Sequence, residues 1–159
     1  NLGRISDREY YVDANQRLMQ SILDSTTLTR TDTEVQGQVV LMKAMYGRDT
    51  DGDGAVDTYD YTTPNSVIGW QNVLAVRLAV VARSGQYEKE TVTTDNPLWD
   101  VGKAATVAGA SDCGASRCVT LRVDAVSDDW QHYRYRVFDT VVPLRNQRFR
   151  SGNLPPAAP

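Results

Sequence analysis

The chain has 159 residues and a formal net charge of −3, with 41% hydrophobic and 23% charged residues. These values are ordinary for a globular protein and allow one domain with a substantial core. The balance is not strongly basic and no run of about 20 apolar residues occurs, which argues against a nucleic-acid partner and against a membrane span in this sequence. Five of the 20 acidic residues lie between residues 49 and 60, so the acidity is local.

The N-terminal third is polar and mixed. Residues 10–12 and 16–23 are expected to form short strands around a turn at residues 13–15, although the apolar spacing of residues 17–24 equally allows a helix. Residues 26–33 are expected to form a Thr- and Asp-rich loop. The apolar, β-branched segment 35–46 predicts one strand that leads into the acidic segment, with a helix as the alternative.

Residues 49–60 read Asp-Thr-Asp-Gly-Asp-Gly-Ala-Val-Asp-Thr-Tyr-Asp, which has the ligand spacing of an EF-hand-type calcium loop. Gly54 stands at position 6, where such a loop turns sharply. Hard dications prefer oxygen ligands, and several carboxylates this close repel one another without a cation between them. The loop therefore predicts a Ca²⁺ site. Its expected ligands are the side chains of Asp49, Asp51, Asp53 and Asp57, directly or through water, the backbone carbonyl of Ala55, and Asp60 at position 12.

The pattern departs from an EF-hand in two ways. Asp60 stands where Glu is usual, and its shorter side chain reaches less easily for bidentate contact. The flanking residues do not read as helices, because Gly47 precedes the loop and Pro64 follows it closely. We therefore expect the loop between β elements. The alternative is a solvated turn without an ion, since Asp and Gly are common turn residues.

Residues 73–83 predict a central strand, because both alternating sets of side chains are largely apolar. The fully apolar set is expected to be the buried face: Leu74, Val76, Leu78 and Val80. The other set contains Arg77 and is expected to be less buried.

The second half of the chain is expected to be loop-rich over residues 87–110 and then to form a β-hairpin. Residues 118–126 and 130–142 both alternate, and a Ser-Asp-Asp turn separates them. Pro143 ends the second strand. The expected fold is mainly β, or α+β, with an antiparallel sheet in a single domain over residues 1–150. The Pro-rich residues 151–159 are expected to be a disordered tail.

The two cysteines, Cys113 and Cys118, enclose Gly-Ala-Ser-Arg, and this spacing favours a small disulfide-closed loop. Two free thiols are the alternative. Zinc is disfavoured because His132 is the single histidine. A disulfide together with a calcium loop favours an oxidising compartment, either the periplasm or the cell exterior.

No catalytic constellation is apparent. His132 stands alone, and the chain has no nucleophile elbow, phosphate loop or dinucleotide motif. The aromatic residues are expected to serve packing rather than a sugar platform. The alternating Tyr and Arg side chains of residues 133–136 are expected to form a solvated face rather than a nucleic-acid surface. We therefore expect a protein that is not an enzyme.

Three segments in order resemble the PilW family of type IV pilus minor pilins. These are residues 39–48 running into the acidic loop, residues 70–84, and residues 130–146, the last being the most specific. The resemblance implies a β-sheet head and an N-terminal hydrophobic helix, absent here, that anchors the subunit in the inner membrane. It also implies partners among other minor pilins, with a possible tip adhesin, in a tip complex that primes pilus assembly.

The expected location is the bacterial cell envelope, at the inner membrane and periplasm before assembly and on the extracellular pilus afterwards. The rival hypothesis is a calcium-binding module of a surface adhesin that binds a ligand through its aromatic face.

Overall fold

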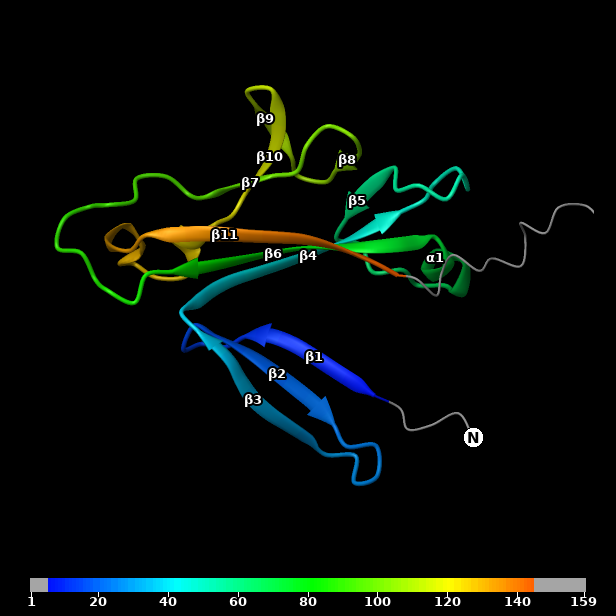
Figure 1. The fold of residues 1–159 in the computed structure, drawn as a ribbon, viewed down its shortest axis with the longest axis horizontal. Coiled ribbons are helices and arrows are strands. Elements are labelled where there is room, and N and C mark those ends of the chain that lie inside the picture. The colour runs from blue at the N-terminus through cyan, green and yellow to red at the C-terminus, as the bar shows by residue number, and fades with distance from the viewer. Residues whose placement is uncertain (1–5, 145–159) are drawn as a thin grey trace, which may run out of the picture. The chain divides into compact units, whose positions relative to one another are not determined.

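A computed structural model describes residues 6–144 and shows a mainly β protein, as the sequence predicts (Figure 1). Its strands form three sheets, with orders β1-β2-β3, β7-β10-β9 and β11-β6-β4-β5-β8. The strands are β1 Asp7–Val12, β2 Arg17–Leu23, β3 Arg30–Gly37, β4 Val39–Arg48, β5 Thr58–Asp60, β6 Val73–Arg83, β7 Leu98–Asp100, β8 Thr106–Val107, β9 Ser111–Cys113, β10 Ser116–Thr120 and β11 Tyr135–Pro143. The helical turns are α1 Val67–Gln71, η1 Val123–Ala125 and η2 Trp130–His132.

The described residues divide into two compact units. The first comprises residues 6–42, 80–98 and 120–138, and the second comprises residues 43–79, 99–119 and 139–144. The expected disordered tail, residues 151–159, lies outside the described residues. None of the helices in residues 6–144 combines the length and apolar character needed to cross a membrane.

The first unit contains the hairpin of β1 and β2, so the strand alternative for the N-terminal third is confirmed and the helix alternative is wrong. Asp13 organises the turn, because its Oδ1 accepts hydrogen bonds from the N–H groups of Asn15, at 3.0 Å, and Arg17, at 2.9 Å. Its Oδ2 also lies 2.7 Å from the Arg17 guanidinium. Both interactions favour the ionised carboxylate, which lowers the pKa of Asp13.

The third strand begins earlier than the sequence suggests. The expected loop at residues 26–33 ends at Thr29, because β3 starts at Arg30 and pairs antiparallel with β2. The expected single strand over 35–46 is also wrong. Gln38 adopts a positive φ of 60°, which separates β3 from β4. A residue other than glycine in the left-handed region gives little signal in the sequence. The apolar pattern therefore predicted one continuous strand across this break.

Strand β6 matches its predicted bounds, but the prediction of its buried face is wrong. The buried side chains are Val73, Ala75, Ala79 and Val81, with 0–4% of their surface exposed. The expected core residues Leu74, Val76, Leu78 and Val80 are only half-buried. Both charged residues of β6, Arg77 and Arg83, lie in the same alternating set as these buried side chains, so that set appeared the more solvated in the sequence.

Arg77 is nevertheless enclosed, with 14% of its side chain exposed. Its guanidinium lies 5.7 Å from the ring centroid of Tyr59 and 5.5 Å from that of the buried Trp99. Its NH1 and NH2 groups donate to the carbonyl oxygens of Val101 and Asp100. These contacts satisfy the charge through cation–π attraction and hydrogen bonds, so Arg77 belongs to the packed face.

The expected hairpin of residues 118–126 and 130–142 is not present. Strand β10 lies between β7 and β9, whereas β11 lies beside β6. The residues between them form η1 and η2. Leu121 and Val123 are fully buried, and the Leu121 N–H donates to the Pro97 carbonyl. Ala125, which alternates with them, is exposed. The alternation of residues 118–126 therefore did not show that the chain turns here.

The observed burial predicts which side chains hold the second unit together. Met45 on β4 is 0% exposed, so Met45→Ala should lower the free energy of unfolding by about 2–5 kcal/mol. Leu78→Ala should cost less, because Leu78 is half-buried. Urea denaturation with an unchanged slope would measure both losses. A greater loss for Leu78→Ala would contradict the assignment of the buried face.

Candidate metal centre

The acidic loop starts where β4 ends and is organised around Asp49, which is 3% exposed. The Asp49 N–H donates to the carbonyl of Asn72, the C-cap residue of α1, at 2.9 Å. Its carboxylate accepts hydrogen bonds from the N–H groups of Gly52, at 2.5 Å, and Gly54, at 3.1 Å. One buried carboxylate thus fixes the path of the next five residues.

The two glycines meet the conformational demand of this turn. Gly52 and Gly54 have φ of 88° and 87°, in the left-handed region that side chains with a Cβ rarely adopt. The aspartates next to these glycines accept hydrogen bonds from the backbone. The Asp51 carboxylate accepts the N–H of Asp53 at 3.1 Å, and the Asp53 carboxylate accepts the N–H of Ala55 at 2.7 Å. Such short side-chain-to-backbone bonds are typical of Asp in turns.

Asp57 lies near the end of the loop, and its carboxylate is hydrogen-bonded to Thr50 near the start of the loop. One Asp57 carboxylate oxygen accepts the Thr50 N–H at 2.6 Å and the Thr50 hydroxyl at 2.7 Å. The N–H bond and then the hydroxyl bond lower the pKa of Asp57 from its usual 3.8, because both stabilise the anion. Sequence reasoning missed Thr50, since position 2 of a calcium loop is not a ligand position.

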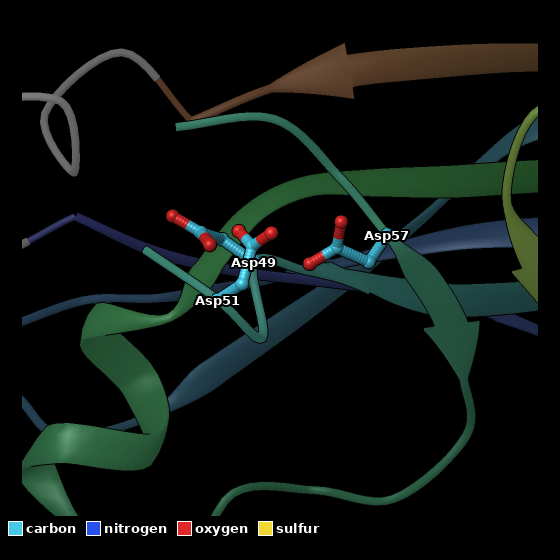
Figure 2. Close-up of side chains that lie close together, drawn as sticks. All are labelled: Asp49, Asp51 and Asp57. Atoms are coloured by element: carbon cyan, nitrogen blue, oxygen red, sulfur yellow. The ribbon is translucent and has the colours of Figure 1, made fainter. Parts of the chain in front are cut away.

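The structure brings together Asp49, Asp51 and Asp57, whose nearest carboxylate oxygens all lie within 4.8 Å of one another (Figure 2). A point between three such oxygens lies at most about 2.8 Å from each of them, close to the 2.3–2.6 Å range of calcium–oxygen contacts. Three carboxylates also match the hard oxygen donors that calcium prefers. The side chains that gather here therefore fit a divalent cation.

Two expected ligands lie elsewhere. Asp60 forms an ion pair with Arg48, with 2.8 Å between Arg48 Nε and Asp60 Oδ2, and it also accepts the Thr62 N–H at 2.7 Å. Asp53 is exposed and caps the Ala55 N–H. The spacing placed five acids in one loop, and the structure brings three of their carboxylates together. The spacing did not show that the neighbouring Arg48 holds the carboxylate of Asp60 in a different place.

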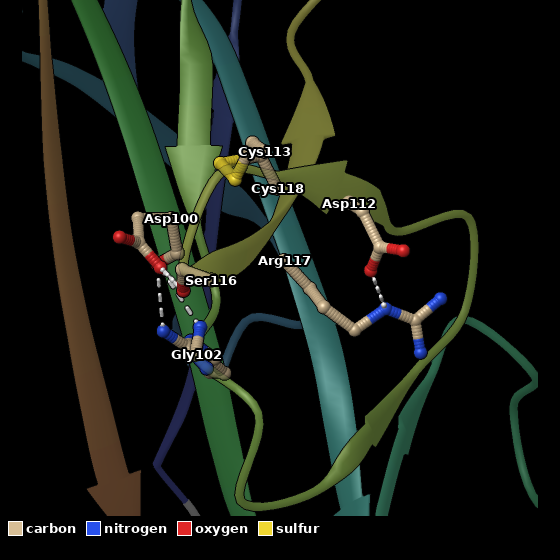
Figure 3. The surroundings of a disulfide bond; sticks show 8 residues. Asp100, Gly102, Asp112, Cys113, Ser116, Arg117 and Cys118 are labelled. Carbon is tan, nitrogen blue, oxygen red and sulfur yellow. Dashed lines mark hydrogen bonds and ion pairs between the residues drawn. A yellow bond between two sulfur atoms is a disulfide. The ribbon is translucent and has the colours of Figure 1, made fainter.

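The two cysteines form the disulfide Cys113–Cys118, with Cα atoms 5.8 Å apart (Figure 3). It closes the hairpin of β9 and β10, in which Ser116 lies opposite Cys113. Beside it, Asp100 accepts hydrogen bonds from the Ser116 hydroxyl, at 2.5 Å, and the Gly102 N–H, at 2.9 Å. Together these contacts fasten β7 to the closed hairpin.

His132 lies against Glu88 and Tyr87. Its Nδ1 lies 2.9 Å from the Glu88 carbonyl, and its ring stacks on Tyr87 with 4.8 Å between centroids. Tyr133 meets the same Tyr87 edge-on and lies under the Arg83 guanidinium. The aromatic residues near the start of β11 thus contact one another and do not form a flat row along the strand.

Comparison with known proteins identifies one family. Residues 9–146 match the family described as Type IV Pilus-assembly protein W, PilW, so the match begins upstream of the segments that suggested the resemblance. No curated protein and no solved structure matches the chain. Because the family match spans most of the sequence, the chain belongs to the PilW family of type IV pilus assembly proteins.

Proposed function

We propose that this chain is the head of a minor pilin that helps form a tip complex for pilus assembly, and that its acidic loop binds Ca²⁺. Family membership supports a role in type IV pilus assembly and contacts within that machinery. The observation that carries the calcium proposal is the gathering of the three carboxylates of Asp49, Asp51 and Asp57.

Charge is the physical reason for a cation at this place. Asp49 is buried, and two further carboxylates lie within 4.8 Å of it. Like charges at this separation repel strongly where water is partly excluded, and the N–H groups of the loop supply only partial positive charge. A divalent ion between the carboxylates offsets this repulsion, because its attraction to each carboxylate is electrostatically favourable.

The proposed ligand set follows the observed positions. Asp49, Asp51 and Asp57 supply carboxylate oxygens, and the Ala55 carbonyl and water complete the shell of six to eight oxygens. Asp53 contributes through water. Asp60 joins this set only if it gives up its ion pair with Arg48. The expected dissociation constant is that of extracellular modules, about 10⁻⁴–10⁻³ M.

The proposed location is the cell envelope, first at the inner membrane and periplasm and then on the extracellular pilus. Family membership supports envelope association, and the Cys113–Cys118 disulfide is compatible with an oxidising compartment. The proposed partners are other minor pilins and a tip adhesin. The proposed role is structural rather than catalytic.

Deletion of the gene in its own organism should abolish or strongly reduce surface pili, and the full-length gene should restore them. Co-purification from the complemented strain should recover other minor pilins, because the proposed role is assembly of a complex. Electron microscopy and subunit mass spectrometry would measure both results. Normal piliation after deletion would instead favour the surface-adhesin alternative.

Calcium should raise the melting temperature of the protein and a chelator should lower it, because an ion bound to the folded state stabilises it. Asp51→Asn should remove this response while keeping the acceptor for the Asp53 N–H. Asp112→Asn is the matched control, since Asp112 is an exposed acid on β9 outside the loop. Equal melting temperatures with calcium and with chelator, and no heat on titration, would refute the proposed metal site.

Thr50→Val should raise the pKa of Asp57 toward its usual value, because the hydroxyl donor is lost while the N–H donor remains. A lowered carboxyl pKa contributes stability above the pKa of the unfolded chain, and this is lost as the pH falls through the folded-state pKa. The variant should therefore lose less stability on acidification.

A carboxyl NMR titration in chelator would measure the pKa of Asp57. The pKa of Asp24, lowered by the N–H groups of Thr26 and Thr27, is an internal reference that should not change. An unchanged Asp57 pKa in the variant would show that the hydroxyl bond does not stabilise the anion.

A further inference from the structure

We propose that the outer edge of β11 and an adjoining apolar cavity form a docking site for an extended strand of another polypeptide. In this arrangement the strand pairs with residues 139–143. One of its apolar side chains enters the cavity and a neighbouring basic side chain meets Asp53. This surface lies next to the acidic loop but does not require an ion there.

The first observation is that β11 is the last strand of its sheet, next to β6. The Leu144 N–H donates to the Leu74 carbonyl at 2.8 Å, so the backbone groups of residue 144 face β6. Because backbone groups alternate along a strand, those of Val141 and Asp139 face the outer edge. An edge of this kind offers N–H and C=O groups that an added strand can pair with.

The second observation is that this edge carries few of the features that usually protect one. Val141 and Val142 are 46% and 48% exposed, and residues 139–143 contain no lysine. The one charged side chain, Asp139, lies 3.6 Å from the Arg77 guanidinium. Pro143 lacks an N–H and limits pairing at one end only. The remaining edge is apolar and accessible.

The third observation is a cavity of about 420 Å³ at the end of this strand. Its walls are loop residues 54–56, Leu74 and Ala75 of β6, and Pro143 and Leu144. This volume and lining suit an apolar side chain. Strand addition of this kind commonly combines backbone pairing, which gives affinity, with a side-chain pocket, which gives specificity.

Charge identifies the neighbouring residue on the partner. Asp53 immediately precedes Gly54, the first loop residue that lines the cavity. It is an exposed carboxylate that accepts the Ala55 N–H and lies outside the three-carboxylate cluster. The lining residues include no basic side chain. An exposed carboxylate one residue away from an apolar cavity complements an apolar residue flanked by Lys or Arg.

The test uses the full chain and a fluorescein-labelled peptide, Thr-Val-Arg-Phe-Arg-Val-Thr, followed by fluorescence anisotropy with calcium and, separately, with chelator. The peptide should bind in both conditions. Replacing its Phe by Ala, or both Arg by Glu, should weaken binding about tenfold or more, since a lost contact of 1.4 kcal/mol has that effect.

Val141→Pro removes an outward N–H without removing a bond to β6, so it should weaken peptide binding about tenfold with little change in melting temperature. Val142→Thr is the matched control, because it alters the neighbouring exposed side chain and keeps every N–H. Asp53→Asn should weaken binding of the Arg peptide and not of a peptide with Gln in place of Arg.

Absence of peptide binding, or equal binding by the Val141→Pro variant, would overturn the proposal. A concentration-dependent dimer in sedimentation that Val141→Pro abolishes would assign the edge to a second copy of this chain, and would overturn the proposed occupant. Binding that is independent of calcium would leave the docking site standing even where the metal proposal fails.

Discussion

The second unit depends on the burial of one carboxylate, that of Asp49. A buried carboxylate requires hydrogen-bond donors, and here the N–H groups of Gly52 and Gly54 supply two of them. The backbone N–H of the same residue is tied to the carbonyl of Asn72, immediately before β6. The end of β4, the acidic loop and the start of β6 are therefore fixed together at one residue, and the positions of Asp51 and Asp57 follow from it.

Local sequence patterns predicted element types better than element partners. The whole of β6 follows from alternation, and the hairpin of β1 and β2 was one of the two alternatives that the sequence pattern allowed. Pairing between strands that are distant in sequence has no such local pattern. The predicted hairpin of residues 118–126 and 130–142 was therefore wrong, since β10 and β11 belong to different sheets. The break at Gln38 was also invisible, because a positive φ at glutamine depends on the strands it connects rather than on the residue itself.

In the candidate site, too, the local spacing of residues was predictable from the sequence, whereas their contact partners were not. Spacing alone placed all five acids in one candidate site, and the structure brings the carboxylates of Asp49, Asp51 and Asp57 together in a loop with two left-handed glycines. Spacing could not identify which acids have other partners. Arg48 is adjacent to the loop in sequence, yet only the antiparallel pairing of β4 with β5 places it beside Asp60. The stabilising Thr50 hydroxyl likewise becomes apparent only when the loop is closed.

The position of Arg77 has a consequence for how the second unit responds to acidity. A guanidinium does not deprotonate in proteins, so its donation to the carbonyls of Val101 and Asp100 and its contact with the Tyr59 and Trp99 rings persist at every pH. Asp57 in the acidic loop, in contrast, loses its charge when acid protonates it, and the hydrogen bonds from Thr50 lower the pKa at which this happens. The unit thus joins a titratable rim to a packed centre of constant charge. Acid can alter the loop's electrostatics while the cation that holds β7 against β6 keeps its protons.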